Sequence, residues 1–289
     1  MDIRRLRLFL AVVDAGGFTA AANEVHVAQP AVSLAVRELE QELGTALFVR
    51  SRAGATLTAA GQALVGPARQ TLRDLENARA AVDAVTGLVS GHLEIACLPT
   101  LAADPVAELV GAFRRSHPGV GVRLAAPQDV AELAAQVRSG VVELGITDAG
   151  PSNHGLEVHP LAEQEVLAVS APARPRPTGP LRLRDVAGMP LVLSPTGSSV
   201  RDVVDVALAD AGVDPEVAVE SGQRDALIPL VLAGAGTAFL PETLARAAER
   251  LGAVVQPTVP RLRRRVVIVH RPDDLGPAAT RFLALSLDG

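Results

Sequence analysis

The chain has a single cysteine, Cys97, among its 289 residues. One thiol cannot form a disulfide within the chain, and it excludes a metal site built from several cysteines. It also excludes a redox sensor that works through an internal disulfide. Because Cys97 lies in an apolar run, it has the setting of an inert, buried thiol. We therefore expect no metal site and no cofactor.

Lysine, tryptophan and tyrosine are absent, so all 27 basic residues are arginines. The abundance of alanine, valine and glycine suggests a GC-rich genome, and codon usage alone explains the arginines. The net charge of −5 does not indicate a nucleic-acid-binding protein. Residues 1–60 are themselves neutral, with six arginines and six acidic residues. A DNA-binding surface must therefore depend on where the charges lie.

No hydrophobic run is long enough to cross a bilayer. The longest uncharged stretches are 53–68 and 226–241, and both are broken by glycine and proline. A signal peptide is not evident, because Asp14 directly follows the short run LFLAVV. The length predicts more than one domain with a substantial core. We expect a cytoplasmic protein with no membrane partner.

Residues 18–42 predict two short helices joined by a tight turn, the first over 20–25 and the second over 29–42. In the second helix an apolar stripe follows helical spacing, formed by Val32, Val36, Leu39 and Leu43. A polar stripe lies on another, exposed face, formed by Gln29, Ser33 and Arg37. This pattern is typical of a helix-turn-helix whose second helix enters the major groove of DNA. Any helical hairpin with an amphipathic second helix has the same spacing.

The N-terminal part of the chain resembles LysR-type transcriptional regulators. Five elements occur in the family's order and at its spacing: LRLFLAVVDAGGFTAAA, QPAVS, RELEQELG, LFVR and LTAAG. The resemblance implies a winged helix-turn-helix that binds double-stranded DNA through Gln29, Pro30, Ser33, Leu34, Arg37, Arg50 and Arg52. The family commonly has Arg or Lys where this chain has Leu34, which can contact a thymine methyl but cannot hold a phosphate. The family often has a capping serine where this chain has Ala28.

The segment after Gly44 predicts a two-stranded wing with its turn at Gly54. This wing would place Arg50 and Arg52 beside the DNA backbone, although the same arginines could simply lie in a solvated loop.

A long helix is predicted from Thr58, which can cap it, to about Val85. A 4-3 repeat along this helix predicts a coiled-coil seam of Leu64, Ala68, Thr71, Leu75, Ala78 and Val82. The family's equivalent helix makes the dimer. The alternative is that the stripe packs on the chain's own C-terminal domain. Residues 87–91 predict a hinge.

From His92 onward, apolar strand-like runs alternate with helical patterns, which predicts parallel sheets of α/β type. The resemblance implies an effector domain like a periplasmic binding protein, with two Rossmann-like lobes joined by two crossover strands. The crossovers are expected near 161–166 and 263–267. The predicted domains are a winged helix-turn-helix over 1–57, a dimerisation helix and hinge over 58–91, and an effector domain over 92–289. Lobe I would take 92–162 and 268–289, and lobe II 163–267.

Open α/β sheets bind ligands beyond the carboxyl ends of their strands. This rule selects Pro99, Thr100, Gln128, Thr147, Thr196, Gly197, Ser198, Ser199 and Gln223. Free N–H groups at the helix start near Ser198 favour an anion, and Arg201 could add positive charge. For any single residue a simpler role is equally compatible: either serine could cap its helix, and Arg201 could form an intrachain salt bridge.

Two other classes of protein are alternatives to a transcriptional regulator. An enzyme could use Cys97 as nucleophile, with a base among His92, His117, His154 and His159. A periplasmic solute-binding protein shares the two-lobe plan. The apolar setting of Cys97 opposes the first, and the N-terminal DNA-binding pattern opposes the second. We therefore predict a regulator and not an enzyme.

The resemblance also implies an assembly and partners. A homodimer would form through the long helix, and a homotetramer through the effector lobes. Two recognition helices would occupy successive major grooves of an interrupted palindrome. A small-molecule effector would shift the lobes and so re-space the DNA-binding parts. RNA polymerase would be a partner if the protein is an activator.

Overall fold

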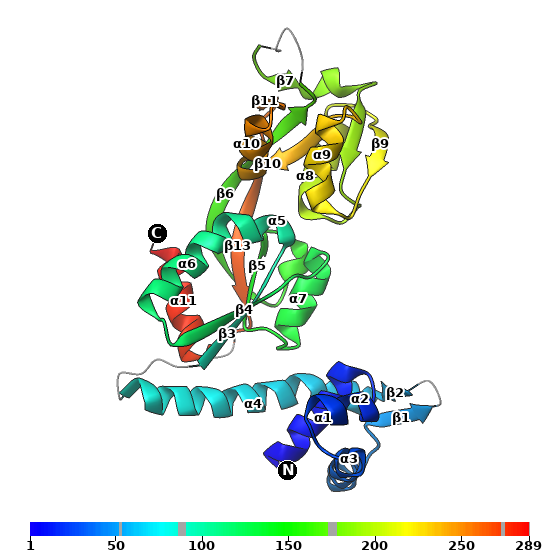
Figure 1. Cartoon of the computed structure of the whole chain (residues 1–289), viewed down its shortest axis with the longest axis vertical. Helices are drawn as coiled ribbons and strands as arrows, with labels where there is room; N and C mark the ends of the chain where they lie inside the picture. The colour runs from blue at the N-terminus through cyan, green and yellow to red at the C-terminus, as the bar shows by residue number, and fades with distance from the viewer. Residues whose placement is uncertain (52–53, 86–90, 173–177, 273–274, 289) are drawn as a thin grey trace.

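The computed structural model describes residues 1–51, 54–85, 91–172, 178–272 and 275–288. Figure 1 shows a small N-terminal head beside one end of a long helix, α4 (Ala59–Val85), and two α/β lobes on the other side of that helix. Among the described residues, no helix combines the length and the apolar character needed to span a lipid bilayer.

The head packs three helices and a hairpin around phenylalanines. Its elements are α1 (Ile3–Ala15), α2 (Phe18–Glu24), α3 (Gln29–Leu43), β1 (Phe48–Ser51) and β2 (Gly54–Leu57). The ring of Phe48 lies 5.5 Å from that of buried Phe9 and 5.4 Å from that of Phe18, measured between centroids. Helix α2 begins at Phe18, two residues before the predicted start, and the half-buried ring of Phe18 packs against this core.

Local sequence accounts for the ends of the helices in the head. Both α1 and α3 end at glycines in the left-handed region, Gly16 at φ 71° and Gly44 at φ 70°. Ala28 precedes α3 and gives no side-chain cap, as predicted, and Pro30 lies in the first turn. Leu43 is 40% exposed, so the buried stripe of α3 ends one turn earlier than predicted, at Leu39.

The first half of α4 belongs to the head. Thr58 Oγ1 accepts a hydrogen bond from the Gly61 amide at 3.0 Å, so Thr58 does cap this helix. Ala68 is 1% exposed within the core of the head, and Leu64 packs against that core. Ala68 is therefore covered by its own chain, which removes it from the predicted dimer seam, whereas Leu64 stays half-buried. The repeat did not reveal this because α1, which lies beside α4, is distant in sequence.

The second half of α4 contacts lobe I through arginines. Arg73 donates to the Gly140 carbonyl and to Gln70 Oε1, which also accepts from Arg271 at 2.6 Å. Arg271 donates to the Val137 carbonyl at 2.8 Å as well. These carbonyls lie at the C-terminal end of a helix in lobe I, where cations are favourable. Except for Gly91, the predicted hinge lies outside the described residues.

Lobe I is built on three parallel strands, β3 (Gly91–Cys97), β4 (Val120–Ala125) and β5 (Leu144–Asp148), in the order β5-β3-β4. Its helices are α5 (Pro99–Leu101), α6 (Ala107–Ser116), α7 (Val130–Arg138) and α11 (Pro277–Leu287), with a short 3-10 helix η2 (Pro151–Asn153). The segment η1 (Ala102–Val106) joins α5 to α6 and is kinked at Asp104, whose backbone is extended. Phe113 of α6 meets Phe282 of α11 edge to face, which joins the two ends of this region of the chain in one core.

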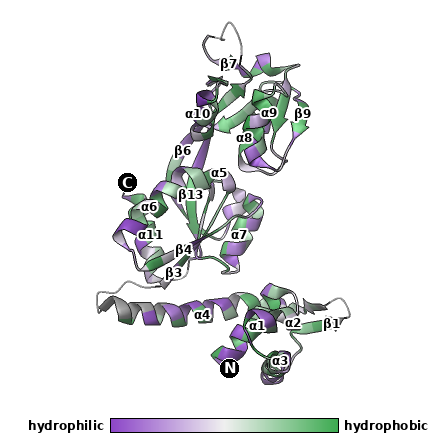
Figure 2. Ribbon diagram, in the orientation of Figure 1, coloured by the Kyte–Doolittle hydropathy of each residue, from purple (hydrophilic) through white to green (hydrophobic). Residues whose placement is uncertain are grey.

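Two long antiparallel strands cross between the lobes, β6 (Glu157–Ser170) and β13 (Leu262–His270). They contain the predicted crossovers, but they make the sheet mixed, whereas the sequence predicts parallel pairing. The reason is that one strand leaves lobe I and the other returns to it. Figure 2 shows β6 as hydrophilic where it passes between the lobes, although strands elsewhere in the sheet are mostly apolar.

Lobe II is built on β8 (Pro190–Leu193), parallel to β9 (Glu216–Glu220), and on β10 (Ala238–Pro241), which pairs with β6. Its helices are α8 (Ser199–Asp210), α9 (Leu227–Leu232) and α10 (Glu242–Arg250), with short 3-10 helices η3 (Leu183–Val186) and η4 (Arg224–Ala226). Three short strands were not predicted: β7 (Leu181–Arg182), β11 (Val254–Gln256) and β12 (Thr258–Val259). Two clusters of buried apolar residues form the core of this lobe.

Candidate DNA-binding face and effector cavity

The exposed face of α3 has four of the predicted DNA-binding residues: Gln29, Pro30, Leu34 and Arg37. Leu34 is 52% exposed. A single exposed apolar side chain is common, so it is the position of Leu34 on the face of Gln29 and Arg37 that makes it a candidate. Ser33 is only 5% exposed, so its predicted place on an exposed stripe is wrong. Its hydroxyl accepts from Gln29 Nε2 at 2.9 Å, and its carbonyl accepts from Arg37 Nε at 3.1 Å. Ser33 therefore orients the two longer polar side chains.

The wing is attached to α3 by a carboxylate. Glu40 Oε1 accepts from the amides of Leu47 at 2.8 Å and Phe48 at 3.3 Å, just where β1 begins. Arg50 lies in β1 opposite Ala55, and Arg52 lies outside the described residues. Gly54 is the first residue of β2 and pairs with Ser51, so it stands at the end of the turn between the two strands, and the two residues before it lie outside the described residues.

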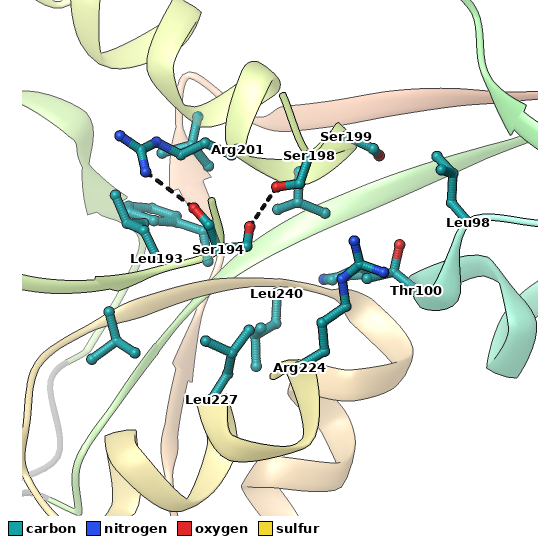
Figure 3. Close-up of a pocket in the computed structure, with 15 residues that line it drawn as sticks. Leu98, Thr100, Leu193, Ser194, Ser198, Ser199, Arg201, Arg224, Leu227 and Leu240 are labelled. Atoms are coloured by element: carbon teal, nitrogen blue, oxygen red, sulfur yellow. Dashed lines mark hydrogen bonds between the residues drawn. The ribbon is translucent and has the colours of Figure 1, made fainter. Parts of the chain in front are cut away.

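A cavity lies between the lobes at the start of α8 (Figure 3). Its volume is about 30 Å³, which is room for one or two water molecules. Lobe I contributes Leu98 and Thr100, and lobe II contributes the rest of the lining. Four residues predicted from strand ends line it together: Thr100, Ser198, Ser199 and Arg201.

The other predicted residues do not line this cavity. Thr196, Gly197, Gln128 and Gln223 are exposed, and Pro99 is half-buried beside Thr100. Thr147 has no exposed surface, because β5 is an inner strand between β3 and β13. Strand ends indicate the correct edge of each sheet, but the side chains that point into the cavity depend on how the two lobes close.

Neither serine acts as a side-chain cap for α8. Ser198 Oγ lies 2.6 Å from Ser194 Oγ, and Ser199 Oγ accepts from Arg264 Nη1 at 2.9 Å. Arg201 does form the intrachain salt bridges that the sequence left open, with Asp205 at 2.7 Å and Glu220 at 3.3 Å. Its positive charge is therefore already neutralised within lobe II.

Arg264 is the main residue that the sequence reasoning missed. It is 2% exposed, and its guanidinium donates to Gln164 Oε1, to Thr100 Oγ1 at 2.9 Å and to Ser199 Oγ at 2.9 Å. It thus joins both crossover strands, lobe I and lobe II. The strand period could have identified it: Leu262, Arg264 and Val266 alternate with exposed neighbours, so Arg264 must point inward with them.

Two carboxylates near the cavity, Asp148 and Asp104, interact electrostatically with Arg264. Burial lowers the pKa of Arg264, and the charges of Asp148 and Asp104 partly oppose that effect. Burial in turn raises the pKa of Asp148, with Arg264 and the Ser199 hydroxyl opposing it. Gln164 donates to the Asp104 carbonyl at 2.9 Å, and the Asp104 carboxylate accepts from Thr243 of lobe II. A continuous polar network therefore connects the lobes.

Arg224, at the start of η4, is the second cavity residue that the sequence reasoning missed. It follows Gln223, which was selected from the strand end, and it points into the cavity where Gln223 does not. Figure 3 shows its side chain extending from lobe II toward Thr100. Its only hydrogen bond within the described part of the chain is a long one, 3.5 Å, to the Gln128 carbonyl of lobe I.

Comparison with known proteins supports this geometry. The bacterial regulatory helix-turn-helix family of LysR type matches residues 3–62, and the LysR substrate binding domain matches residues 86–289. The chain belongs to the LysR family of transcriptional regulators. The family assignment confirms the predicted fold class, a winged helix-turn-helix followed by a two-lobed α/β effector domain, and the predicted function.

Individual relatives match over most of the chain. The HTH-type transcriptional regulator TfdS of Cupriavidus pinatubonensis is 35% identical over 252 residues, 85% of this chain and 84% of its own. Full-length CbnR, solved with its target DNA, aligns with a TM-score of 0.69 at 25% identity and covers 99% of each chain. A full-length OxyR variant from Pseudomonas aeruginosa has the same fold, with a TM-score of 0.79 at 24% identity over 99% of this chain and 94% of that one.

Cys97 lacks the environment of a nucleophile. It is 2% exposed, and burial raises its pKa to about 11, so the thiol is protonated at neutral pH. Within the described residues no hydrogen bond joins it to a histidine, and the candidate base His159 instead lies 3.0 Å from His270, Nε2 to Nε2. The relatives are transcriptional regulators.

Proposed function

We propose that this LysR-family regulator binds an interrupted palindromic operator as a homodimer, with one α3 from each chain in the major groove. The observation that carries the proposal is the exposed face of α3, where Gln29, Leu34 and Arg37 are free of the core. Ser33, being buried, would act by orienting Gln29 and Arg37. The alignment with CbnR, a relative solved on its target DNA, supports this use of the head.

We propose that the dimer forms through the second half of α4. Thr71 and Ala78 are exposed there, Leu75 is half-buried and Val82 is 68% exposed, so an apolar strip remains uncovered in the single chain. Such a strip on a long helix requires a partner of the same kind. A tetramer through the effector lobes, and contact with RNA polymerase in the case of an activator, complete this proposal.

We further propose three working parts with the predicted boundaries: a DNA-binding part over 1–57, a linker over 58–91 and an effector domain over 92–289. The effector would bind in the inter-lobe cavity, near Thr100, Ser198 and Ser199. Because Arg264 already bridges the lobes at that point, a ligand that exchanges hydrogen bonds with Thr100 or Ser199 would change how the lobes close. This regulation would take place in the cytoplasm, where the operator is found.

The test is selection of operator sequences from random duplexes by the full-length protein, followed by fluorescence anisotropy on the selected duplex and on a scrambled one. We expect an interrupted palindrome, bound on the order of 1000-fold or more tightly than the scrambled duplex. Arg37→Ala should weaken binding, whereas Arg184→Ala, an exposed arginine of lobe II, should not. Failure of any sequence to be enriched would refute the proposal.

A further inference from the structure

The long helix α4 touches lobe I through a small cluster of polar groups. Gln70 and Arg73 of α4 meet Arg271, which directly follows β13 in lobe I. Gln70 Oε1 lies at the centre, because it accepts from Arg73 Nη2 at 2.7 Å and from Arg271 Nη2 at 2.6 Å. The two arginines also donate to the carbonyls of Gly140 and Val137, at the C-terminal end of α7. One amide oxygen therefore joins an arginine of the helix to an arginine of the lobe.

This contact contains little apolar packing. Among the described residues, none from α4 belongs to the apolar core of lobe I, whereas Leu64, Val65, Ala68 and Leu72 of α4 belong to the core of the head. The head and the first half of α4 thus share one core, and lobe I is attached to α4 by polar groups. Water can replace hydrogen bonds of this kind at a small net cost, so such an interface opens more easily than an apolar one.

The charges in the cluster also oppose a permanently closed contact. The pKa of Arg73 is lowered to about 10, first by burial and next by the positive charge of Arg271. Glu143 opposes this effect, but its carboxylate is itself buried and accepts from the Gly276 amide at 3.0 Å. Arg73 Nε is buried without a hydrogen-bond partner in the described part of the chain. The contact therefore brings together two arginines that repel each other, and it depends on the acceptor that they share, Gln70.

We propose that Gln70, Arg73, Arg271 and the two α7 carbonyls form a reversible latch. When closed, the latch holds lobe I against α4; when open, it lets the DNA-binding head turn relative to the effector domain. The head follows α4 in this motion, because its core includes the first half of that helix. None of the latch residues lines the inter-lobe cavity, so the inference does not depend on the proposed effector site.

The latch is compatible with the proposed dimer. Gln70 and Arg73 lie three residues apart and therefore share one face of α4. The strip proposed as the dimer seam, around Leu75, is centred about 140° further around the helix. The same helix can thus hold lobe I on one face and a second chain on another, and the latch can open without separating the dimer.

The experiment measures the distance between α4 and α7 in the full-length protein by time-resolved fluorescence energy transfer. Glu76→Cys and Ala135→Cys, both at exposed positions, attach the donor and acceptor dyes, while the buried Cys97 is not accessible to them. Labelled chains are mixed with a large excess of unlabelled chains, so that a dimer contains at most one labelled chain. We expect a short distance for the closed latch and a longer one for the open latch.

Two substitutions of Gln70 should shift this equilibrium in opposite directions. Gln70→Leu removes the shared acceptor and should raise the open fraction roughly tenfold or more, because hydrogen bonds to two charged groups are lost. Gln70→Glu places a carboxylate between the two guanidinium groups, so this variant should remain closed in mild urea that opens the parent protein. Gln62 is exposed on the same helix, and Gln62→Leu and Gln62→Glu are the matched controls, which should behave as the parent does.

Three results would overturn the latch: a single distance in every variant, an open fraction in Gln70→Leu equal to that in Gln62→Leu, or equal opening of Gln70→Glu and Gln70→Leu. Circular dichroism checks that each variant is folded. If Gln70→Leu does not fold, the comparison of Gln70→Glu with Gln62→Glu in urea decides, and equal opening of these two would reject the proposal.

Discussion

The DNA-binding face and the effector cavity are built in opposite ways. The first consists of side chains from one helix, α3, which point to solvent and make few contacts with the rest of the chain. The second takes side chains from α5, β8, α8, η4 and β10, and β13 adds Arg264 to it. Sequence spacing defines the first except for Ser33, which is buried, while the second exists only when the lobes are folded together.

This difference has an energetic consequence. Exposed residues of α3 contribute little to folding, so a substitution there should change binding alone. Cavity residues bond to one another, as Arg264 does to Thr100 and Ser199, so a substitution there should change folding as well. The following four substitutions test this separation, beginning with the largest expected effect.

Leu75→Glu should abolish the dimer at micromolar concentration and with it tight operator binding. In the proposed seam, Leu75 faces its counterpart, so the change would place two carboxylates against each other in a desolvated contact. Multi-angle light scattering and operator anisotropy measure the two losses, with Glu76→Gln as the control on the same helix. The inter-lobe cavity should be unaffected. A Leu75→Glu protein that remains dimeric would exclude this seam.

Arg264→Met should lower the free energy of unfolding by about 3 kcal/mol, because it leaves Asp148 without its cation and Gln164 without its donor. Arg263→Met is the matched control on the same strand. Its side chain is 50% exposed and pairs with exposed Glu163, so the change should cost less than about 1 kcal/mol. Urea unfolding of the effector-domain transition measures both. Equal losses of unfolding free energy in the two variants would mean that Arg264 does not stabilise the contact between the lobes.

Leu34→Arg should steepen the salt dependence of operator binding by about one unit in the log–log slope for each recognition helix. Preference for thymine at the contacted position should also be lost, because the methyl contact is replaced. Leu43→Arg is the control: it is also exposed, but nine residues further along α3, about 180° around the helix. Stability should be unchanged in both. A slope identical to that of the parent protein would remove residue 34 from the interface.

Asp148→Asn should flatten the pH dependence of stability. Folding raises the pKa of Asp148 above its ordinary 3.8 through burial, so the folded protein holds this proton more tightly than the unfolded chain does. Its contribution to stability is present below the ordinary value and is lost as the pH rises through the folded pKa. Unfolding free energies measured across the acid range should therefore fall less steeply with rising pH in the variant. An unchanged profile would assign this pH dependence to other groups.

Short-range features explain why much of the fold was predictable. Gly16, Gly44 and Thr58 end or begin helices through their own backbone preference or hydroxyl, so their effects are visible without tertiary contacts. The exposed Leu34 was likewise predictable, since helical spacing separates it from the buried stripe. The short strands β7, β11 and β12 were not predicted, because two or three residues show no periodicity.

The amino-acid sequence by itself determined the order of the parts, the recognition helix and the strand ends around which a ligand would bind, because period and capping are local properties of the chain. Tertiary structure decided the rest. Ser33 became buried under its neighbours, Ala68 was covered by α1 and α4 packing together, and Arg201 was neutralised within lobe II. It also decided the contacts of two arginines: Arg224 of lobe II makes a long hydrogen bond to the Gln128 carbonyl of lobe I, whereas Arg264 bonds to side chains of both lobes.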